Sequence, residues 1–518
     1  MNYAFFHSIS DNNQWLQLWP EISLGVIALL LLVLDLVLKK HNSTAIPRIA
    51  VFGQLVVLFA LILQILYQSN DPNVDKIVDW SYFDGLITLT PYGDVGRVFI
   101  LLTSLSVSLL AMVYFQRQAL PRVEFFHLVL VVAAAMMLLV QSTQFVMFFV
   151  ALETVTVGFY VLVAYCRTSP LSLEAGLKYL ILGALSSAIL LFGIVLLYGV
   201  AAAPGALGPG ESLHDPMNFV DLGRVIAHQA SNPLAAIGVA LVLCGVAFKI
   251  GAVPFQIWVP DVYQGAPTPT TAFLAVGSKA AGFLVLLNLV TGPFSAPWLT
   301  HQVLVPLLST LAVLSILYGN LAALGQRNVK RVMGLSGIAH AGYMLVGVVA
   351  AAQGVSWAAG AVLFYLFTYL LGSMSVFGVM VYVAGPDDES QQLEHYADLG
   401  KRQPFLGGVL AIGLGSLAGI PPLAGFIGKL LIFFAAFQAN LHTLLLVSIV
   451  GVVISIYYYF GWMREALFRQ PNVPGIAPSA TVEPPLAPSY WGLYVLLILS
   501  AATLFVGMYQ GFFPESLK

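Results

Sequence analysis

Long apolar runs separated by short polar connections dominate the hydrophobic pattern of this 518-residue chain. A helix rises about 1.5 Å per residue, so about 20 apolar residues can cross the hydrocarbon core of a bilayer. The pattern predicts fourteen such helices, over residues 18–38, 46–67, 94–115, 123–140, 144–166, 175–200, 234–258, 267–291, 301–323, 329–350, 356–384, 404–438, 441–463 and 488–510. We therefore predict an all-α polytopic membrane protein with 14 transmembrane helices.

Two of these runs contain residues that break helices. The seventh, 234–258, carries Gly251 and Pro254, and the twelfth, 404–438, is too long for one straight crossing and carries Pro421 and Pro422. A proline removes a helix hydrogen bond that lipid cannot replace, so such breaks are tolerated only inside the protein. We predict that helices 7 and 12 are broken, which is the arrangement that transporters use to bind ions.

Four lysines lie within or at the start of predicted helices. Lys249 and Lys429 flank the two breaks, and Lys279 lies near the middle of the eighth helix. An ammonium group at bilayer depth costs about 2.5–3.5 kcal/mol on insertion scales, so charge there marks function by default. Lys178 lies near the start of the sixth helix, where it can extend to the interface or pair with Glu174 at i,i+4.

Two further titratable residues fall inside predicted helices. Glu153 lies in the middle of the fifth helix, and His340 lies inside the tenth. A buried carboxylate is protonated or paired, and lysines of neighbouring helices are natural partners. An imidazole, with an ordinary pKa of about 6.5, suits a proton relay, although a lone histidine can equally hydrogen-bond a neighbouring helix.

Composition narrows the class of protein. Hydrophobic residues make up 59% of the chain and charged residues 8%, against about a quarter charged in soluble domains. The two cysteines cannot assemble a disulfide framework, an iron–sulfur cluster or a zinc site, and no nucleotide-binding glycine motif follows a strand pattern. We expect a lipid bilayer as the environment, no nucleic acid as a partner, and no cofactor or metal in this chain.

The distribution of basic residues predicts the orientation, because Lys and Arg are enriched in connections on the inner side of the membrane. The connections after odd-numbered helices contain Lys39, Lys40, Arg48, Arg117, Arg122, Arg167, Arg327, Lys330, Arg331, Lys401, Arg402, Arg464 and Arg469. The opposite side contains only Lys76, Arg97, Arg224 and Lys518. We predict that both termini lie on the outer, periplasmic side.

Several segments resemble one family of membrane proteins. They read LWPEI, LEAGLKYL, VPDVYQGAPTP, NVKRVMGLSGIAHAGYML and GSLAGIPPLAGFIGK. The chain closely resembles the antiporter-like membrane subunits of proton-pumping NADH:quinone oxidoreductase, respiratory complex I, and within them the subunit N branch. The resemblance covers almost the whole chain.

The resemblance implies a domain organisation. Residues 1–122 would hold the first three helices, 123–291 a first five-helix repeat, 301–463 a second repeat inverted relative to the first, and 488–518 the last helix. Each repeat would contain one of the two broken helices.

The resemblance also implies a function. The chain would be a proton-translocating subunit of a translocase in an energy-coupling membrane, most simply the bacterial inner membrane, with other membrane-arm subunits, including further antiporter-like ones, as partners. NADH, flavin, iron–sulfur clusters and quinone would belong to those partners, so no redox chemistry is expected in this chain alone. By match to the family's motifs, the residues of proton transfer are Glu153, Lys249, Lys279 and Lys429, with Lys178 on an auxiliary path, to which we add His340.

The expected mechanism is a switch in which Lys249 keeps its proton while Glu153 is close and releases it toward Lys279 when the two separate. Two alternatives remain at this stage. The chain could belong to a multisubunit sodium/proton antiporter or a related membrane-bound hydrogenase-type complex. Its buried charges could also serve only to hold helices together.

Overall fold

The computed structural model describes residues 15–37, 45–70, 80–116, 120–207, 213–385, 388, 391–468 and 490–509. Both chain ends, and residues 39, 40, 76, 117, 469 and 518 of the charge count, lie outside the described residues. The first half contains η1 Trp15–Leu18, α2 Trp19–Val37, α3 Ala45–Asn70, β1 Trp80–Tyr82, β2 Ile87–Leu89, α4 Pro91–Tyr114, α5 Val123–Gln141, α6 Phe145–Val163, α7 Pro170–Ala201, α8 Phe219–His228, α9 Pro233–Ile250 and α10 Val259–Gly265. The second half contains α11 Thr268–Phe273, η3 Leu274–Ser278, α12 Lys279–Thr291, α13 Pro297–Leu299, η4 Thr300–Leu304, α14 Val305–Leu324, α15 Val329–Ala352, α16 Ala358–Val383, η5 Leu393–Tyr396, α17 Leu399–Arg402, α18 Pro404–Ala418, α19 Ala424–Gln438, α20 His442–Phe468 and α21 Tyr490–Met508.

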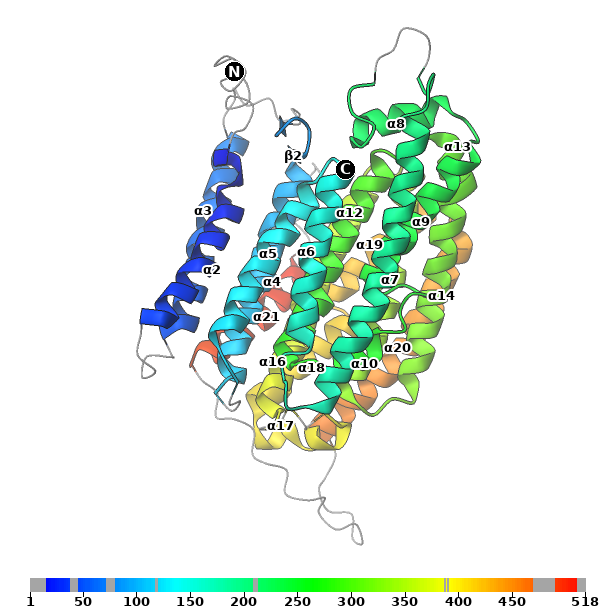
Figure 1. The fold of residues 1–518 in the computed structure, drawn as a ribbon. Coiled ribbons are helices and arrows are strands. Elements are labelled where there is room, and N and C mark those ends of the chain that lie inside the picture. Colours follow the sequence, from blue (N-terminus) through cyan, green and yellow to red (C-terminus); the bar gives the residue numbers. More distant parts are fainter. Residues whose placement is uncertain are drawn as a thin grey trace.

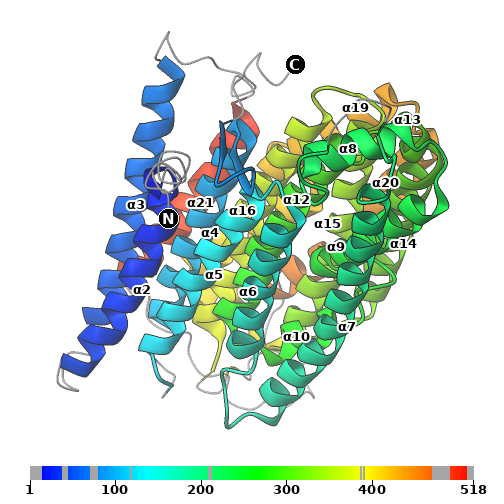
Figure 2. The ribbon, with the colours of Figure 1, turned by 45° about the horizontal axis from the view of Figure 1, so that its top comes forward.

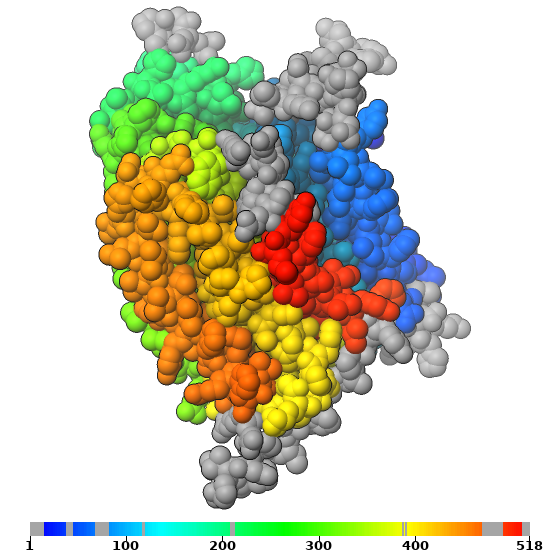
Figure 3. Space-filling view, turned by 180° about the vertical axis from the view of Figure 1, so that it is seen from behind, coloured from blue at the N-terminus to red at the C-terminus, as the bar shows by residue number. Residues whose placement is uncertain are grey.

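The long helices run side by side as one bundle, with the α2–α3 pair at one edge (Figure 1). Thirteen helical segments of the described chain are long and apolar enough to cross a membrane. The shorter apolar helices α18 and α19 follow one another where the twelfth crossing is predicted. The predicted fourteen-helix, all-α membrane fold is therefore confirmed. Seen from behind, α21 (red) lies between the yellow and orange part of the bundle and α2–α3 (blue), and α20 (orange) lies at the edge away from α2–α3 (Figure 3).

Two small elements lie at one end of the bundle. Strands β1 and β2 pair antiparallel, with Tyr82 opposite Ile87. Helix α8 lies across the same end (Figures 1 and 2) and buries Phe219, Leu222, Val225 and Ile226 on one face. It is too short to cross a bilayer, so a search for long apolar runs does not detect it.

Both predicted helix breaks are present. Helix α9 ends at Gly251 with φ 71°, and α18 ends at Gly419 with φ 83°. A left-handed residue of this kind ends a helix, and glycine adopts it without the steric cost of a Cβ atom. The chain then resumes as α10 and α19, respectively, and each break contains a cis proline bond, at Pro254 and at Pro422.

The eighth crossing is also irregular, which the sequence did not predict. It consists of α11, the π-helical turn η3 and α12, and the turn ends immediately before Lys279. Single π-turns inside helices are frequently found at functional sites.

The core of the fold surrounds α15. In the 18-residue apolar window of α15 every residue is buried, and in that of Thr268–Thr291 94% are, against 28% for Trp15–Val37. A helix this enclosed cannot turn toward lipid, so polar groups on it face only protein. This environment holds Lys279 and His340, and Lys429 lies beside it, 5.4 Å from the ring centre of Tyr343.

Candidate functional site

Lys249 lies in the last turn of α9, two residues before the break. Its side chain is only 8% exposed, and its Nζ donates a hydrogen bond to the hydroxyl of Thr156 on α6. The Thr156 hydroxyl in turn donates to the carbonyl of Leu152, 2.6 Å away. The break therefore places an ammonium group in an apolar interior with a hydroxyl as its hydrogen-bond acceptor.

Glu153 lies one turn before Thr156 on α6. It is half-buried, and its carboxylate accepts a hydrogen bond from the Ser187 hydroxyl of α7. No ion pair between Glu153 and Lys249 occurs among the contacts of the described residues. The structure thus brings acid and base to neighbouring positions along one helix, but each contacts a hydroxyl. Sequence reasoning missed Thr156 and Ser187, although the i,i+3 spacing from Glu153 could have pointed to Thr156.

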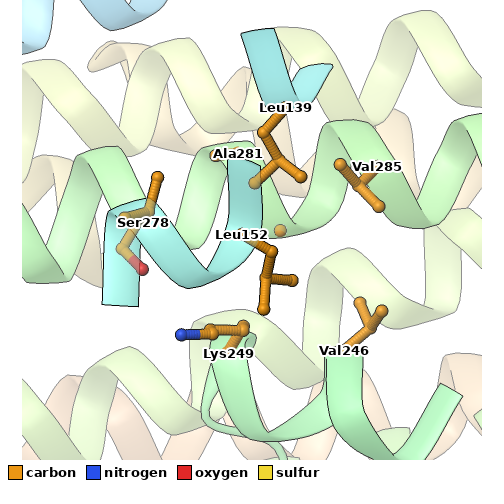
Figure 4. Close-up of a pocket in the computed structure, with 9 residues that line it drawn as sticks. Leu139, Leu152, Val246, Lys249, Ser278, Ala281 and Val285 are labelled. Atoms are coloured by element: carbon orange, nitrogen blue, oxygen red, sulfur yellow. The ribbon is translucent and has the colours of Figure 1, made fainter. Parts of the chain in front are cut away.

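A small cavity connects Lys249 with the eighth crossing. Its volume of about 10 Å³ has room for about one water molecule. In Figure 4, Lys249 and Ser278 mark one end of the cavity and Val246 and Val285 the other. Because Ser278 directly precedes Lys279, the cavity lies between the first lysine and the helix that carries the second.

Lys279 opens α12 directly after the π-turn. It is 4% exposed, and its Nζ donates to the backbone carbonyl of Gly337 on α15. The same Nζ lies 5.7 Å from the ring centre of Tyr369, within cation–π range. A Cβ atom at Gly337 would lie 3.1 Å from this Nζ, so the glycine is what lets the lysine approach the backbone.

His340 lies one turn further along α15. Its Nδ1 is 2.8 Å from the Tyr365 hydroxyl and its Nε2 is 3.1 Å from the Tyr459 hydroxyl. Its ring also lies 5.0 Å from the Tyr369 ring and 6.0 Å from the Tyr343 ring. Lys279 approaches the Tyr369 ring and Lys429 approaches the Tyr343 ring, so His340 lies between the two lysines.

Lys429 lies on α19, after the second break, and is 3% exposed. Its Nζ donates to the carbonyls of Leu417 and Ala418, at 2.8 and 2.9 Å, and lies 5.4 Å from the Tyr343 ring centre. Those carbonyls are the last of α18 and have no helical partner because the helix stops there. The break therefore supplies acceptors for the lysine, at the negative end of a helix dipole.

Lys178 is different from the three buried lysines. Its side chain is 41% exposed, and its Nζ forms ion pairs with Glu174, 2.7 Å away, and with Asp261 of α10, 2.6 Å away. The i,i+4 pair with Glu174 is the one that the sequence suggested. Among the described residues, neither of its ion pairs reaches Glu153 or a buried lysine, so its assignment to an auxiliary path remains a prediction.

Two buried ion pairs were missed because their basic residues were counted as loop charges. Arg97 of α4 binds both carboxylate oxygens of Glu21 on α2, at 2.8 and 3.0 Å, and Gln141 donates to the same carboxylate. Lys330 at the start of α15 lies 2.6 Å from Asp388. The partners are 76 and 58 residues apart in sequence, so no local spacing reveals them.

Metal ligands are a separate question. Within the described ranges, no group of three or more His, Cys, Asp or Glu residues has the geometry to hold a metal ion. The residues described above supply amines, hydroxyls, an imidazole, carboxylates and backbone carbonyls. The amines, the imidazole and the carboxylates can bind and release protons, and the hydroxyls and carbonyls accept hydrogen bonds from them.

These features define a class of protein. A polytopic membrane protein with two broken helices and buried amines beside them has the architecture of ion-translocating membrane proteins. The family described as NADH:quinone oxidoreductase/Mrp antiporter, TM, matches residues 142–455. The chain therefore belongs to this family, which confirms the resemblance predicted from its motifs.

The sequence identity to individual relatives shows which branch of this family the chain belongs to. It is 54% identical over 513 residues to NADH-quinone oxidoreductase subunit N 1 of Opitutus terrae, covering 99% of this chain and 98% of that protein. It is 30% identical, with a TM-score of 0.74, to a chain in the structure of respiratory complex I from Thermus thermophilus with bound aureothin, covering 95% of this chain and 98% of that one.

The fold alone is shared more widely. A chain in the structure of the Mrp complex from a Dietzia species has a TM-score of 0.77 at 20% identity, covering 95% of this chain and 94% of that one. The two TM-scores are similar, so the fold does not distinguish these two matches, whereas the sequence identity does.

Proposed function

We propose that this chain is the subunit N component of a proton-pumping NADH:quinone oxidoreductase, and that it conducts protons through Lys249, Lys279, His340 and Lys429. The observation that carries the proposal is the position of His340. It lies on α15 between the rings that Lys279 and Lys429 approach, so the three groups form one buried sequence of proton acceptors.

The proposed first step is a change at Lys249. A buried ammonium group is stabilised by nearby negative charge, and Glu153 supplies that charge from the neighbouring turn of α6. When the carboxylate moves away, Lys249 releases its proton into the cavity beside Ser278, from which it reaches Lys279. One unit of pKa corresponds to about 1.4 kcal/mol, so small displacements are sufficient.

The energy would come from partner subunits. NADH oxidation and quinone reduction need flavin, iron–sulfur clusters and a quinone site, which we assign to the other subunits of the complex. This chain would contribute proton translocation in the membrane arm, beside further antiporter-like subunits. We place it in the bacterial inner membrane with both termini on the outer side. A reporter enzyme fused after Lys518 that is active only in the cytoplasm would contradict that orientation.

A sodium/proton antiporter subunit is the second candidate, supported by the similar fold of the Mrp chain. The described site argues against sodium as the transported ion. Sodium is bound by several oxygen ligands, whereas the three buried charged residues of the proposed path, Lys249, Lys279 and Lys429, are amines. Transport by the reconstituted complex that depends on sodium would favour this alternative.

The test of the proposed function is proton uptake by liposomes that contain the intact complex, with Lys279→Ala in this chain. Loss of the amine should lower proton translocation about tenfold or more, an increase of about 1.4 kcal/mol in the barrier. Lys401→Ala is the matched control, because Lys401 is 59% exposed and its ion pair among the described residues is with Asp398, three residues before it. Full pumping by assembled Lys279→Ala complex would overturn the proposal.

A further inference from the structure

Helix α15 contacts several parts of the candidate site through residues spaced three apart: Arg331 and Gly334 lie against α10, Gly337 accepts the hydrogen bond of Lys279, and Tyr343 lies beside Lys429. Residues three apart on a helix are neighbours, so these positions form a ridge that winds around α15. The twelve residues from Arg331 to Tyr343 span about 18 Å, so the two ends of this ridge lie roughly half a bilayer apart.

At the start of α15, Arg331 contacts α10, the half-helix that follows the break at Gly251. The Arg331 guanidinium donates from Nη1 to Asp261, 2.8 Å away, and to Gln264, 2.9 Å away. Asp261 is also held by Lys178 from the other side. Asp261 is thus shared between a helix of the first predicted repeat and a helix of the second.

Lys330, the residue before Arg331, binds the turn that follows α10. The Lys330 ammonium donates to the carbonyl of Ala266, 2.9 Å away, and to Asp388, 2.6 Å away. Asp388 in turn accepts from the backbone N–H of Thr268, 3.1 Å away, and from its hydroxyl, 2.9 Å away. Lys330 is 1% exposed, so this pair joins the end of α10 to the start of α11 within the protein interior.

The next residues of this ridge, Gly334 and Gly337, are closely packed against α10 and Lys279. A Cβ atom at Gly334 would lie 3.2 Å from Val259 and 3.3 Å from Tyr263, both of α10. Gly337 accepts the hydrogen bond of Lys279, and the ring of Tyr343 lies under Lys429. A displacement of α10 would therefore be passed directly to the backbone that holds Lys279.

We propose that Lys330 and Arg331, with Asp388 and Asp261, form a clamp that couples the broken helix carrying Lys249 to the segment of α15 around Gly337, which holds Lys279. These four are positioning residues, because among the described contacts none of them touches Lys249, Lys279 or Lys429. The inference rests on the proposed proton path. It adds that the path depends on charges at the end of the bundle opposite α8 (Figure 1).

The test uses Arg331→Gln and Asp261→Asn in the intact complex, because both side chains are about one-third exposed and their loss leaves no fully buried charge. Proton translocation per assembled complex should fall about threefold to tenfold in each variant. The double variant should lose less than the product of the two single losses, because both changes remove the Arg331–Asp261 ion pair, although each also affects a second contact, with Gln264 or with Lys178. Arg331→Lys should restore part of the loss, since it keeps the charge but not the fork that reaches Gln264.

The matched control is Arg327→Gln. Arg327 forms an exposed ion pair with Glu394, at 3.1 Å and with 78% of its side chain exposed, four residues before Arg331. A purely structural clamp would lower the amount of assembled complex and leave translocation per complex unchanged, which would overturn the inference.

Lys279→Ala, measured in parallel, distinguishes failure of the clamp from failure of the proposed proton path. Full pumping by that variant would reject the proton path itself. Loss of pumping in Lys279→Ala beside normal pumping in the clamp variants would reject only the clamp.

Discussion

The two helix breaks hold their lysines in different ways. At the second break, Lys429 lies after the interruption and donates to two carbonyls of α18, the helix that the break has just ended. At the first break, Lys249 lies before the interruption and donates to Thr156, a hydroxyl on a different helix, with Glu153 one turn away. The acceptors of Lys429 are thus backbone groups, and those around Lys249 are side chains.

This difference assigns different roles to the two sites. The carbonyls at the end of α18 are fixed by the helix and cannot change charge, so the environment of Lys429 is constant while the break holds. The hydroxyl and carboxylate near Lys249 can rotate, and the carboxylate can change its charge. In the proposed proton path, Lys249 would therefore be the site at which a signal acts, and Lys429 would take up and release the proton further along without such control.

The largest expected effect is at the lysines themselves. Lys249→Ala and Lys429→Ala each remove a proposed proton carrier, and each should lower proton translocation by about tenfold or more. Lys249→Arg should not restore it, because a guanidinium group does not release its proton at physiological pH. Proton uptake per assembled complex is the measurement. Normal uptake with either alanine variant would remove that lysine from the path.

A smaller effect is expected from alanine at the two break glycines, and it should be unequal. Both positions have positive φ, so an alanine at either costs about 1–2 kcal/mol of stability. At Gly419 a Cβ atom would also lie 2.9 Å from Lys429 Cδ and 3.3 Å from its Nζ, whereas at Gly251 it would approach only Val259. Gly419→Ala should therefore displace its lysine directly and lose more proton uptake per complex than Gly251→Ala. Equal losses would mean that the break and the lysine act independently.

A still smaller effect is expected at the hydroxyls. Thr156→Val keeps the shape of the side chain and removes the acceptor of Lys249, and a hydrogen bond to a charged group contributes about 1.5–3 kcal/mol. We expect a loss of proton uptake of about threefold and a pH profile that moves to lower pH, because the charged form of Lys249 has lost an acceptor. Thr154→Val, on the same helix but exposed, is the control. An unchanged pH profile with Thr156→Val would show that the hydroxyl is not part of the switch.

The sequence predicted the crossings and the breaks because those features are local. An apolar run of about 20 residues and a proline inside it are visible without knowing the fold. The lysines were found for the same reason, since charge in an apolar run stands out. The contacts of Lys429 follow from the break itself, because a helix that stops leaves free carbonyls.

What the sequence could not show depends on contacts between distant segments. Lys330 and Arg97 lie near helix ends, where basic residues are ordinary, and only the fold reveals that Asp388 and Glu21 are buried beside them. The expected direct contact between Glu153 and Lys249 also depends on the fold, and in the structure each of the two contacts a hydroxyl instead. Which of two nearby polar groups a buried ammonium contacts depends on side-chain geometry, and the hydroxyl of Thr156 occupies that position.

The central claim is that Glu153 and Lys249 act as a switch and not as a structural pair. Its most direct test is proton uptake per assembled complex for Glu153→Gln, Lys249→Ala and the double variant Glu153→Leu with Lys249→Met. A switch predicts that all three assemble and that none pumps normally. A structural pair predicts that the single variants fail to assemble and that the apolar double variant recovers, because well-packed apolar residues can replace a buried pair. Full pumping by the assembled double variant would contradict the switch.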